Sequence, residues 1–265
     1  MDIKDINTES PYRQLLFHLF LLNRANSTSP FGGSDTQELF ESNCKNPETK
    51  ALLQQHGWLD RPIEYRYNQQ GYRCPEFDDR ENFIALGCSF TEGVGVPVEQ
   101  SWPAMLSSTM GLHGWNLGIG GASQMSVARL LPMAVNLLKP KFVVILLPPS
   151  SRIDVIAANG FSDTYSPSHQ KDAIWFTHAK VTSSYLKNWF ANDENAALST
   201  KMVLAYLESI SKELSMPIII INSDQARTEL HYMRDLARDL RHDGPRVSRS
   251  IADMFLERLV EKKIV

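Results

Sequence analysis

The sequence predicts an α/β fold: a three-layer α/β/α sandwich around a mostly parallel, flavodoxin-like sheet of about five strands. Three apolar runs, at Phe83–Leu86, Phe142–Leu147 and Pro217–Ile221, have the length and continuous hydrophobicity of strands buried on both faces. Amphipathic helical patterns separate these runs, and that alternation is typical of a parallel sheet. With 265 residues, 43% of them hydrophobic, the chain can build one large core, although length alone also allows two smaller domains.

Residues 1–80 are interpreted as an N-terminal extension packed on the core, and residues 81–265 as the main domain. An amphipathic helix is expected between residues 11 and 23, around "LLFHLFLL", and the "NSTSPFGGSD" stretch after it has the composition of a loop. The alternating, aromatic-rich stretch from residue 63 to residue 73 predicts a strand followed by a turn.

The main domain begins with the strand "FIAL". The "SWPAMLSSTM" stretch predicts a helix with Ser101 as N-cap and Pro103 in its first turn, where a missing N–H costs little. A short strand, "WNLG", follows. Apolar residues at helical spacing then run from Val127 to Leu138, and Pro132 should kink that helix or mark its true start.

Two further helices complete the alternation. Apolar residues at helical spacing between Val203 and Leu214 predict a helix before the "PIIII" strand. The last helix is predicted from four apolar residues on one face, at positions 247, 251, 255 and 259.

An insertion of the main domain is expected at about residues 159–200, between the third strand and the next helix. Its aromatic residues are Tyr165, Trp175, Phe176, Tyr185, Trp189 and Phe190. The insertion would lie over the strand tips, either as a lid or pocket for an acyl or sugar group, or only as a cover for the sheet. Its His169 and His178 have no carboxylate or cysteine partner at ligand spacing, so no metal site is expected.

Composition argues against several classes of protein. The net charge is −3, from 27 basic and 30 acidic residues, so the composition does not indicate a basic surface that would bind nucleic acid. Three cysteines, Cys44, Cys74 and Cys88, form no Cys-x-x-Cys pair, which favours a reducing compartment over a disulfide framework. The start of the chain lacks a basic signal region and the 15–22 run is too short to span a bilayer. A cytoplasmic location is therefore expected, and export by another route stays open.

Ligands of parallel sheets bind at the carboxyl ends of the strands, where this chain places "GCSFTEG", "GIGGAS" and "PPSSR". In the first, Ser89 follows a strand at a glycine-bounded turn, a position that suits a nucleophile. Ser89 could instead only cap the turn. A phosphate loop is disfavoured because no Gly-Lys-Ser/Thr ending is present.

A serine nucleophile needs a base and a group that orients the base. Near the C-terminus, "ARDLRHDGP" places Asp239 three residues before His242. A tight turn there could set the carboxylate against one imidazole nitrogen and leave the other facing the sheet tip. The alternative is a solvated turn in a run of charges.

The "NLGIGGAS" stretch contains Asn116 and a set of glycines in a strand-to-helix turn. Glycine lets a backbone N–H approach a reacting oxygen closely, so Gly118, Gly120 and Gly121 are candidates for contact with such an oxygen. The alternative is a partial dinucleotide fingerprint in which Ser123 replaces the third glycine.

Taken together and in order, these stretches resemble the SGNH (GDSL-type) hydrolase superfamily over about residues 82–265. "GCSFTEG" is similar to its first block, with Ser89 at the nucleophile, and "NLGIGGAS" to its second, with Gly121 at the oxyanion glycine. "DLRH" is similar to the last block, with Asp239 as orienting acid and His242 as base. Upstream, "NQQGYR" is similar to a stretch that precedes the first block in some members.

Two positions depart from the family pattern. Cys88 stands where the family has aspartate, and a small buried hydrophobe is the expected role for this thiol. "PPSSR" stands where the third block offers Gly-x-Asn-Asp, which puts Ser150 at the asparagine that donates to the oxyanion. Losing one such donor costs about 2.7–4 kcal/mol, so Ser150, Ser151 or Arg152 would have to substitute, or activity would be weak.

The resemblance implies an esterase that acts on a small-molecule, lipid or sugar ester through an acyl-enzyme, without a cofactor. Its catalytic residues would be Ser89, Asp239 and His242, and its oxyanion hole would use Ser89, Gly121 and Ser150. Three alternatives stay open: an acyltransferase with the same serine, a degenerate binding protein of the same fold, and a nucleotide-binding protein that uses the "GIGGAS" turn.

Overall fold

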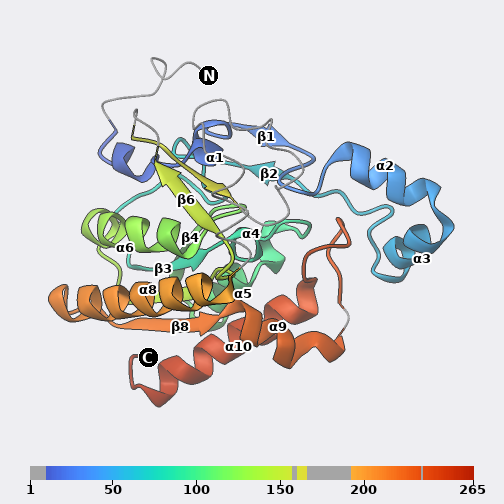
Figure 1. Cartoon of the computed structure of the whole chain (residues 1–265). Helices are drawn as coiled ribbons and strands as arrows, with labels where there is room; N and C mark the ends of the chain where they lie inside the picture. Colours follow the sequence, from blue (N-terminus) through green and yellow to red (C-terminus); the bar gives the residue numbers. More distant parts are fainter. Residues whose placement is uncertain (1–9, 157–159, 166–191, 234) are drawn as a thin grey trace.

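The computed structural model describes residues 10–156, 160–165, 192–233 and 235–265. Its centre is a parallel sheet of four strands, in the order β4-β3-β5-β8 (Figure 1). The strands are β3 (Asn82–Gly87), β4 (His113–Gly118), β5 (Val143–Leu147) and β8 (Ile218–Asn222). The sheet follows the predicted α/β pattern, and each predicted apolar run forms or overlaps a strand.

The strand order is the flavodoxin order without its last strand, because β4 and β5 lie on opposite sides of β3. The point where the order reverses lies between β3 and β5, and in such sheets ligands bind there at the carboxyl ends. The expectation of about five strands is too high for the described residues. Between β8 and the last helix the sequence has no apolar run, so that stretch cannot supply a buried fifth strand.

Helices cover both faces of the sheet, which gives the three predicted layers (Figure 1). One face packs Ile84 and Leu86 of β3 against α6 (Gln124–Leu138) and α8 (Asp193–Glu213). The other packs Phe83 and Ala85 against α5 (Trp102–Met110), α9 (Ser223–Leu230) and α10 (Pro245–Glu261). Successive side chains of a strand point to opposite faces, so a strand buried on both sides must be apolar throughout.

Most of the helix predictions in the main domain are confirmed. Ser101 is the N-cap residue of α5 and Pro103 lies in its first turn, although the Ser101 hydroxyl donates to Val98 O instead of capping. α6 starts at Gln124, so Pro132 lies inside the helix and does not mark its start. All four predicted face residues of α10 are buried.

The prediction of a single helix between residues 11 and 23 is wrong. The chain forms a 3-10 turn, η2 (Arg13–Leu15), and a short helix, α1 (Leu19–Leu22), with an extended His18 between them (φ −114°, ψ 138°). The His18 ring accepts the Phe20 N–H and contacts Thr164 Oγ1, so its buried polar contacts replace the helical hydrogen bonds there. Side chains of this segment nevertheless share the hydrophobic core of the α6 face, as expected.

The rest of the extension lies beside the sheet. The two-residue strands β1 (Thr28–Ser29) and β2 (Tyr65–Arg66) pair antiparallel, which confirms a short strand in the 63–73 stretch. Two helices that the sequence reading missed, α2 (Gln37–Lys45) and α3 (Pro47–Gln55), stand at one side of the molecule (Figure 1). A domain boundary at residue 80 stays a prediction.

At the start of the expected insertion, β7 (Ser162–Tyr165) pairs antiparallel with β6 (Ile153–Ile156), which lies just before it. The aromatic residues Trp175, Phe176, Tyr185, Trp189 and Phe190, with His169 and His178, lie outside the described residues. The remaining elements are α4 (Ser89–Glu92), η3 (Val98–Gln100) and η5 (His231–Met233). Of the helices that the structure describes, none is long and apolar enough to cross a lipid bilayer.

Candidate active site

Ser89 sits at the tip of the sheet, where the chain leaves β3 and turns into α4. The turn is tight because Gly87 lies against Thr91 and the Leu146 carbonyl, with no room for a Cβ. Ser89 is the first residue of α4, and the Gly93 in left-handed conformation ends this helix after one turn (φ 81°). Only 7% of Ser89 is exposed, so its hydroxyl lies in a mostly desolvated position at the strand end.

Asp239 and His242 come from the loop between η5 and α10, here called the acid–base loop (residues 235–243). One carboxylate oxygen of Asp239, Oδ1, accepts the backbone N–H groups of Arg241 and His242, both at 3.0 Å. This turn folds the His242 side chain back over the carboxylate, as the three-residue spacing predicts. Leu240 adopts a left-handed conformation within it (φ 55°).

The structure brings the three predicted catalytic residues into one chain of contacts. His242 Nδ1 lies 2.7 Å from Asp239 Oδ2, and His242 Nε2 lies 2.7 Å from Ser89 Oγ. Because a carboxylate only accepts hydrogen bonds, we place the imidazole proton on Nδ1. Nε2 is then free to accept the Ser89 hydroxyl proton, which is the arrangement of a nucleophile, a base and an orienting acid.

The surroundings of Asp239 favour its charged form. Burial alone would raise the pKa of this carboxyl, but the hydrogen bond and charge of His242 and the hydroxyl of Ser34 outweigh it and hold the pKa at about 2. For neighbouring Asp243, burial is the main influence and raises the pKa, against the opposing charges of Arg227 and His242. Asp239 is therefore the carboxylate that stays ionised beside the imidazole.

Two backbone donors lie at the sheet tips. The N–H groups of Ser89 and Gly121 donate no hydrogen bond to any other described residue. Gly121 has a left-handed backbone (φ 79°), a conformation that glycine adopts without strain. Asn116 joins the two turns, because its side chain donates to Thr91 O at 2.8 Å and accepts the Gly118 N–H.

The Ser123 hydroxyl caps α6, since it accepts the N–H groups of Met125 and Ser126. Those N–H groups are therefore occupied and cannot bind a phosphate. This geometry disfavours the dinucleotide alternative for the "GIGGAS" turn.

The turn after β5 is tied to the turn after β4. Arg152 Nη1 donates to Ala122 O at 3.0 Å, and the buried Gln124 amide donates to Pro148 O at 3.0 Å. Ser150 and Ser151 are half-buried in the turn itself, and neither side chain bonds another described residue. Arg152 is thus held by a backbone carbonyl, whereas both serine hydroxyls remain available.

Cys88 is fully buried in the core of the α6 face. This confirms the prediction of a packed thiol where the family pattern has an aspartate. Among the described residues, no group of three or more histidine, cysteine or acidic side chains gathers as a metal site would.

Sequence reasoning missed three side chains around Ser89, Asp239 and His242. The Phe90 ring packs on the His242 ring with centroids 4.9 Å apart, and the Arg227 guanidinium lies over Phe90 at 4.6 Å. Ser34 donates to Asp239 Oδ2 at 2.7 Å from the distant extension. Phe90 could have been suspected as the residue after the nucleophile, but no local signal marks Ser34 or Arg227.

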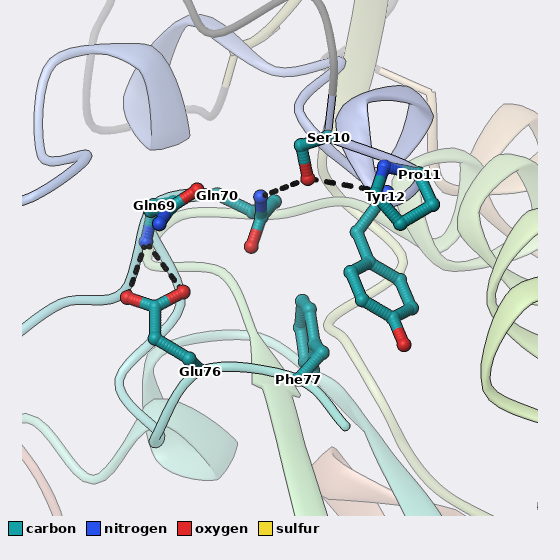
Figure 2. A pocket seen from close by; sticks show the side chains of 7 residues that line it. All are labelled: Ser10, Pro11, Tyr12, Gln69, Gln70, Glu76 and Phe77. Atoms are coloured by element: carbon teal, nitrogen blue, oxygen red, sulfur yellow. Dashed lines mark hydrogen bonds between the residues drawn. The ribbon is translucent and has the colours of Figure 1, made fainter. Parts of the chain in front are cut away.

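A separate hollow of about 340 Å³ lies between the start of the described chain and the 69–77 stretch. Figure 2 shows the Tyr12 and Phe77 rings on one side of it and the Gln70–Ser10 contact on the other. The lining residues are Ser10, Pro11, Tyr12, Gln69, Gln70, Glu76 and Phe77. They include none of the three residues of the catalytic contact chain.

No protein-family model matches the chain, and no curated protein matches it in sequence. Among solved structures, the chain is similar to TesA, with 13% identity and a TM-score of 0.38, over 70% of this chain and 100% of that one. It is also similar to a member of the lipolytic protein G-D-S-L family from Veillonella parvula (14%, TM-score 0.35, 67% and 97%). A third is AlinE4, described as an SGNH-hydrolase family esterase (11%, TM-score 0.31, 55% and 60%).

The family names of the last two structures, SGNH-hydrolase and G-D-S-L, are those of the superfamily whose motifs the sequence resembles. What bears on activity in this chain is the geometry of Ser89, His242 and Asp239.

Proposed function

We propose that this protein is a serine hydrolase that cleaves a carboxylic ester through an acyl-enzyme. The observation that carries the proposal is the unbroken contact chain from Ser89 Oγ through both nitrogens of His242 to Asp239, with 2.7 Å at each step. Ser89 and His242 are 153 positions apart in the sequence, so local chain geometry does not explain why the three side chains line up. The alignment is the geometry that activates a hydroxyl.

In the proposed first half-reaction, Ser89 Oγ attacks the ester carbonyl while its proton passes to His242 Nε2. The bond from the carbonyl carbon to the leaving oxygen then breaks, and His242 returns the proton to the departing alcohol. In the second half, water attacks the acyl-enzyme, gives its proton to His242, and Ser89 regains one as the acid leaves. Asp239 stays ionised throughout and holds the imidazolium.

The tetrahedral oxyanion would be held by the N–H groups of Ser89 and Gly121, with the Ser150 hydroxyl as the third donor. The unoccupied hydrogen-bonding capacity of these two N–H groups supports this assignment. Donors that are already aimed where charge develops stabilise the transition state more than the substrate. The substrate we propose is a small molecule, lipid or sugar that carries an acyl or acetyl ester.

The test is hydrolysis of short p-nitrophenyl esters together with labelling by a fluorophosphonate, which reacts with an activated serine. Wild-type protein should hydrolyse the ester and take up one label on Ser89. Ser89→Ala should lose the label, and kcat should fall by a factor on the order of 10⁴–10⁶ while the melting temperature stays close to that of the wild type.

Cys88→Ala is the matched neighbour, because it removes the adjacent thiol and should keep most of the activity. If Ser89→Ala retains the wild-type rate and Cys88→Ala does not, the thiol is the nucleophile and the proposal is wrong. Adding a small acceptor alcohol separates hydrolysis from acyl transfer, since a transferase would form the new ester faster than the free acid. A wild type that neither turns over nor labels would favour a binding protein of this fold.

A further inference from the structure

Ser34 contacts the catalytic acid from outside the predicted hydrolase domain. Its hydroxyl lies 2.7 Å from Asp239 Oδ2, the same oxygen that faces His242, and 3.4 Å from His242 Nδ1. Because the carboxylate can only accept, the Ser34 O–H is the donor. The contact joins residues that are 205 positions apart in the sequence.

With Ser34 in place, every acceptor position of Asp239 is used. Oδ1 receives two backbone N–H groups, and Oδ2 receives the His242 ring N–H and the Ser34 hydroxyl. A carboxylate has about four lone-pair sites, so four donors hold it in one orientation. Without the Ser34 hydroxyl, the only donor left to Asp239 Oδ2 among these four would be the His242 ring, whose orientation Asp239 itself has to fix.

The extension holds Ser34 against the loop by its own structure. Gly32 and Asp35 exchange backbone hydrogen bonds across a tight turn, in which Gly33 takes a left-handed conformation (φ 65°). The next side chain, Asp35, binds Arg238 through Nε at 3.0 Å and Nη2 at 2.7 Å. Arg238 directly precedes Asp239, so two neighbouring residues of the turn contact two neighbouring residues of the acid–base loop.

The anchor beneath this contact is buried. The exposed fractions of the Arg238 and Asp35 side chains are 5% and 1%, and the Tyr65 hydroxyl donates to the same carboxylate at 2.7 Å. Arg238 Nη2 also donates to Pro30 O at 2.6 Å, and its guanidinium lies over the Phe31 ring at 4.6 Å. Ser34 is therefore presented to Asp239 by a rigid base rather than by a free loop.

We infer that Ser34 is a positioning residue for the catalytic acid: its hydroxyl holds the Asp239 carboxylate with Oδ2 toward His242, so that His242 Nε2 faces Ser89. The inference rests on the proposed hydrolase function. It also means that the extension supplies part of the catalytic apparatus. Because the Ser34 hydroxyl is bonded to Asp239, its loss should lower kcat rather than raise KM.

The test compares Ser34→Ala, Ser34→Thr and the control Ser27→Ala. Ser27 is also a half-buried serine of the extension, but its hydroxyl bonds Arg24 O. Ser34→Ala should lower kcat and the fluorophosphonate labelling rate roughly ten- to hundredfold, as expected for a hydrogen bond to a charged group, with KM changed less than twofold. Ser34→Thr, which keeps the hydroxyl, should recover most of the rate, and Ser27→Ala should match the wild type.

A double-mutant cycle separates positioning from a general structural effect. In an Asp239→Asn background, Ser34→Ala should change the labelling rate less than twofold, because the carboxylate on which it acts is gone. A wild-type kcat in Ser34→Ala, or an equal loss in both backgrounds, overturns the inference.

The NMR resonance of the His242 Nδ1 proton gives a readout that needs no turnover. Ser34→Ala should shift or broaden this resonance, and an unchanged resonance overturns the inference even if no ester is turned over. A wild type that fails to label or hydrolyse would instead overturn the proposed function, so the two failures are distinguishable.

Discussion

The parallel sheet and the N-terminal extension contribute to the site in different ways. The sheet places Ser89 and Gly121 through its backbone, because Ser89 lies two residues after the end of β3 and Gly121 three residues after the end of β4. The extension contributes through side chains, with Ser34 and Asp35 contacting Asp239 and Arg238 of a loop more than 200 positions away. In the proposed mechanism the sheet tips thus supply the nucleophile and the oxyanion donors, and the extension orients the carboxylate that holds the base.

Asp35 is the residue of the extension whose loss should affect the acid–base loop most. Asp35→Ala leaves the buried Arg238 guanidinium without its carboxylate, and breaking a buried pair from one side costs about 3–5 kcal/mol. We expect the free energy of unfolding in urea to fall by about this amount. The labelling rate of Ser89 should fall as well, because Arg238 is joined to Asp239.

The control for Asp35→Ala is Glu81→Ala, which breaks the exposed pair between Glu81 and Lys141. Exposed pairs contribute little to stability, so this variant should unfold like the wild type. Equal behaviour of the two variants would show that the extension does not hold the acid–base loop.

The sheet and the contact chain from Ser89 through His242 to Asp239 could be predicted because their signals are local. An apolar run, a glycine turn and an Asp-x-x-His spacing each lie within a few residues, and the alternation of strands and helices gives their order. The break of the first helix at His18 could not be predicted, because Thr164 that contacts its ring is 146 positions away. The role of Ser34 was hidden for the same reason: its neighbours in sequence look like an ordinary Gly-Ser loop.

At the sheet tips, the third proposed oxyanion donor is a side chain, that of Ser150, rather than a backbone N–H. If Ser150 donates to the oxyanion, Ser150→Ala should lower kcat by about 100- to 1,000-fold, or about 2.7–4 kcal/mol, with little change in KM. Steady-state kinetics on a p-nitrophenyl ester measure both constants.

Ser151→Ala is the neighbour for comparison and should leave kcat near that of the wild type. Ser150→Asn restores the residue of the family pattern and tests whether a longer donor fits after the two prolines. If Ser150→Ala leaves kcat unchanged and Arg152→Ala lowers it, the third donor is the Arg152 guanidinium and not the Ser150 hydroxyl. In the structure that guanidinium donates to Ala122 O.

The extension contacts the β6–β7 strand pair through His18, whose ring lies against Thr164 Oγ1. The His18 ring is buried, and this burial is the main reason that its pKa is lowered from 6.5 to about 4, with Arg129 and Arg24 acting in the same direction and Asp154 against it. A histidine whose pKa is lower in the folded state takes up a proton more readily when unfolded. Stability should therefore fall as the pH drops from 6.5 toward 4, and this loss should level off below 4.

The full difference corresponds to roughly 3 kcal/mol, measured as urea unfolding free energy at several pH values. His18→Asn is the informative variant, because its side-chain oxygen can still accept the Phe20 N–H but carries no titrating ring. Its unfolding free energy should depend less steeply on pH between 4 and 6.5 than that of the wild type. If the unfolding free energies of the two proteins depend on pH in the same way, His18 is not the source of the pH dependence. The extension would then be stabilised here by hydrophobic packing and not by the protonation state of His18.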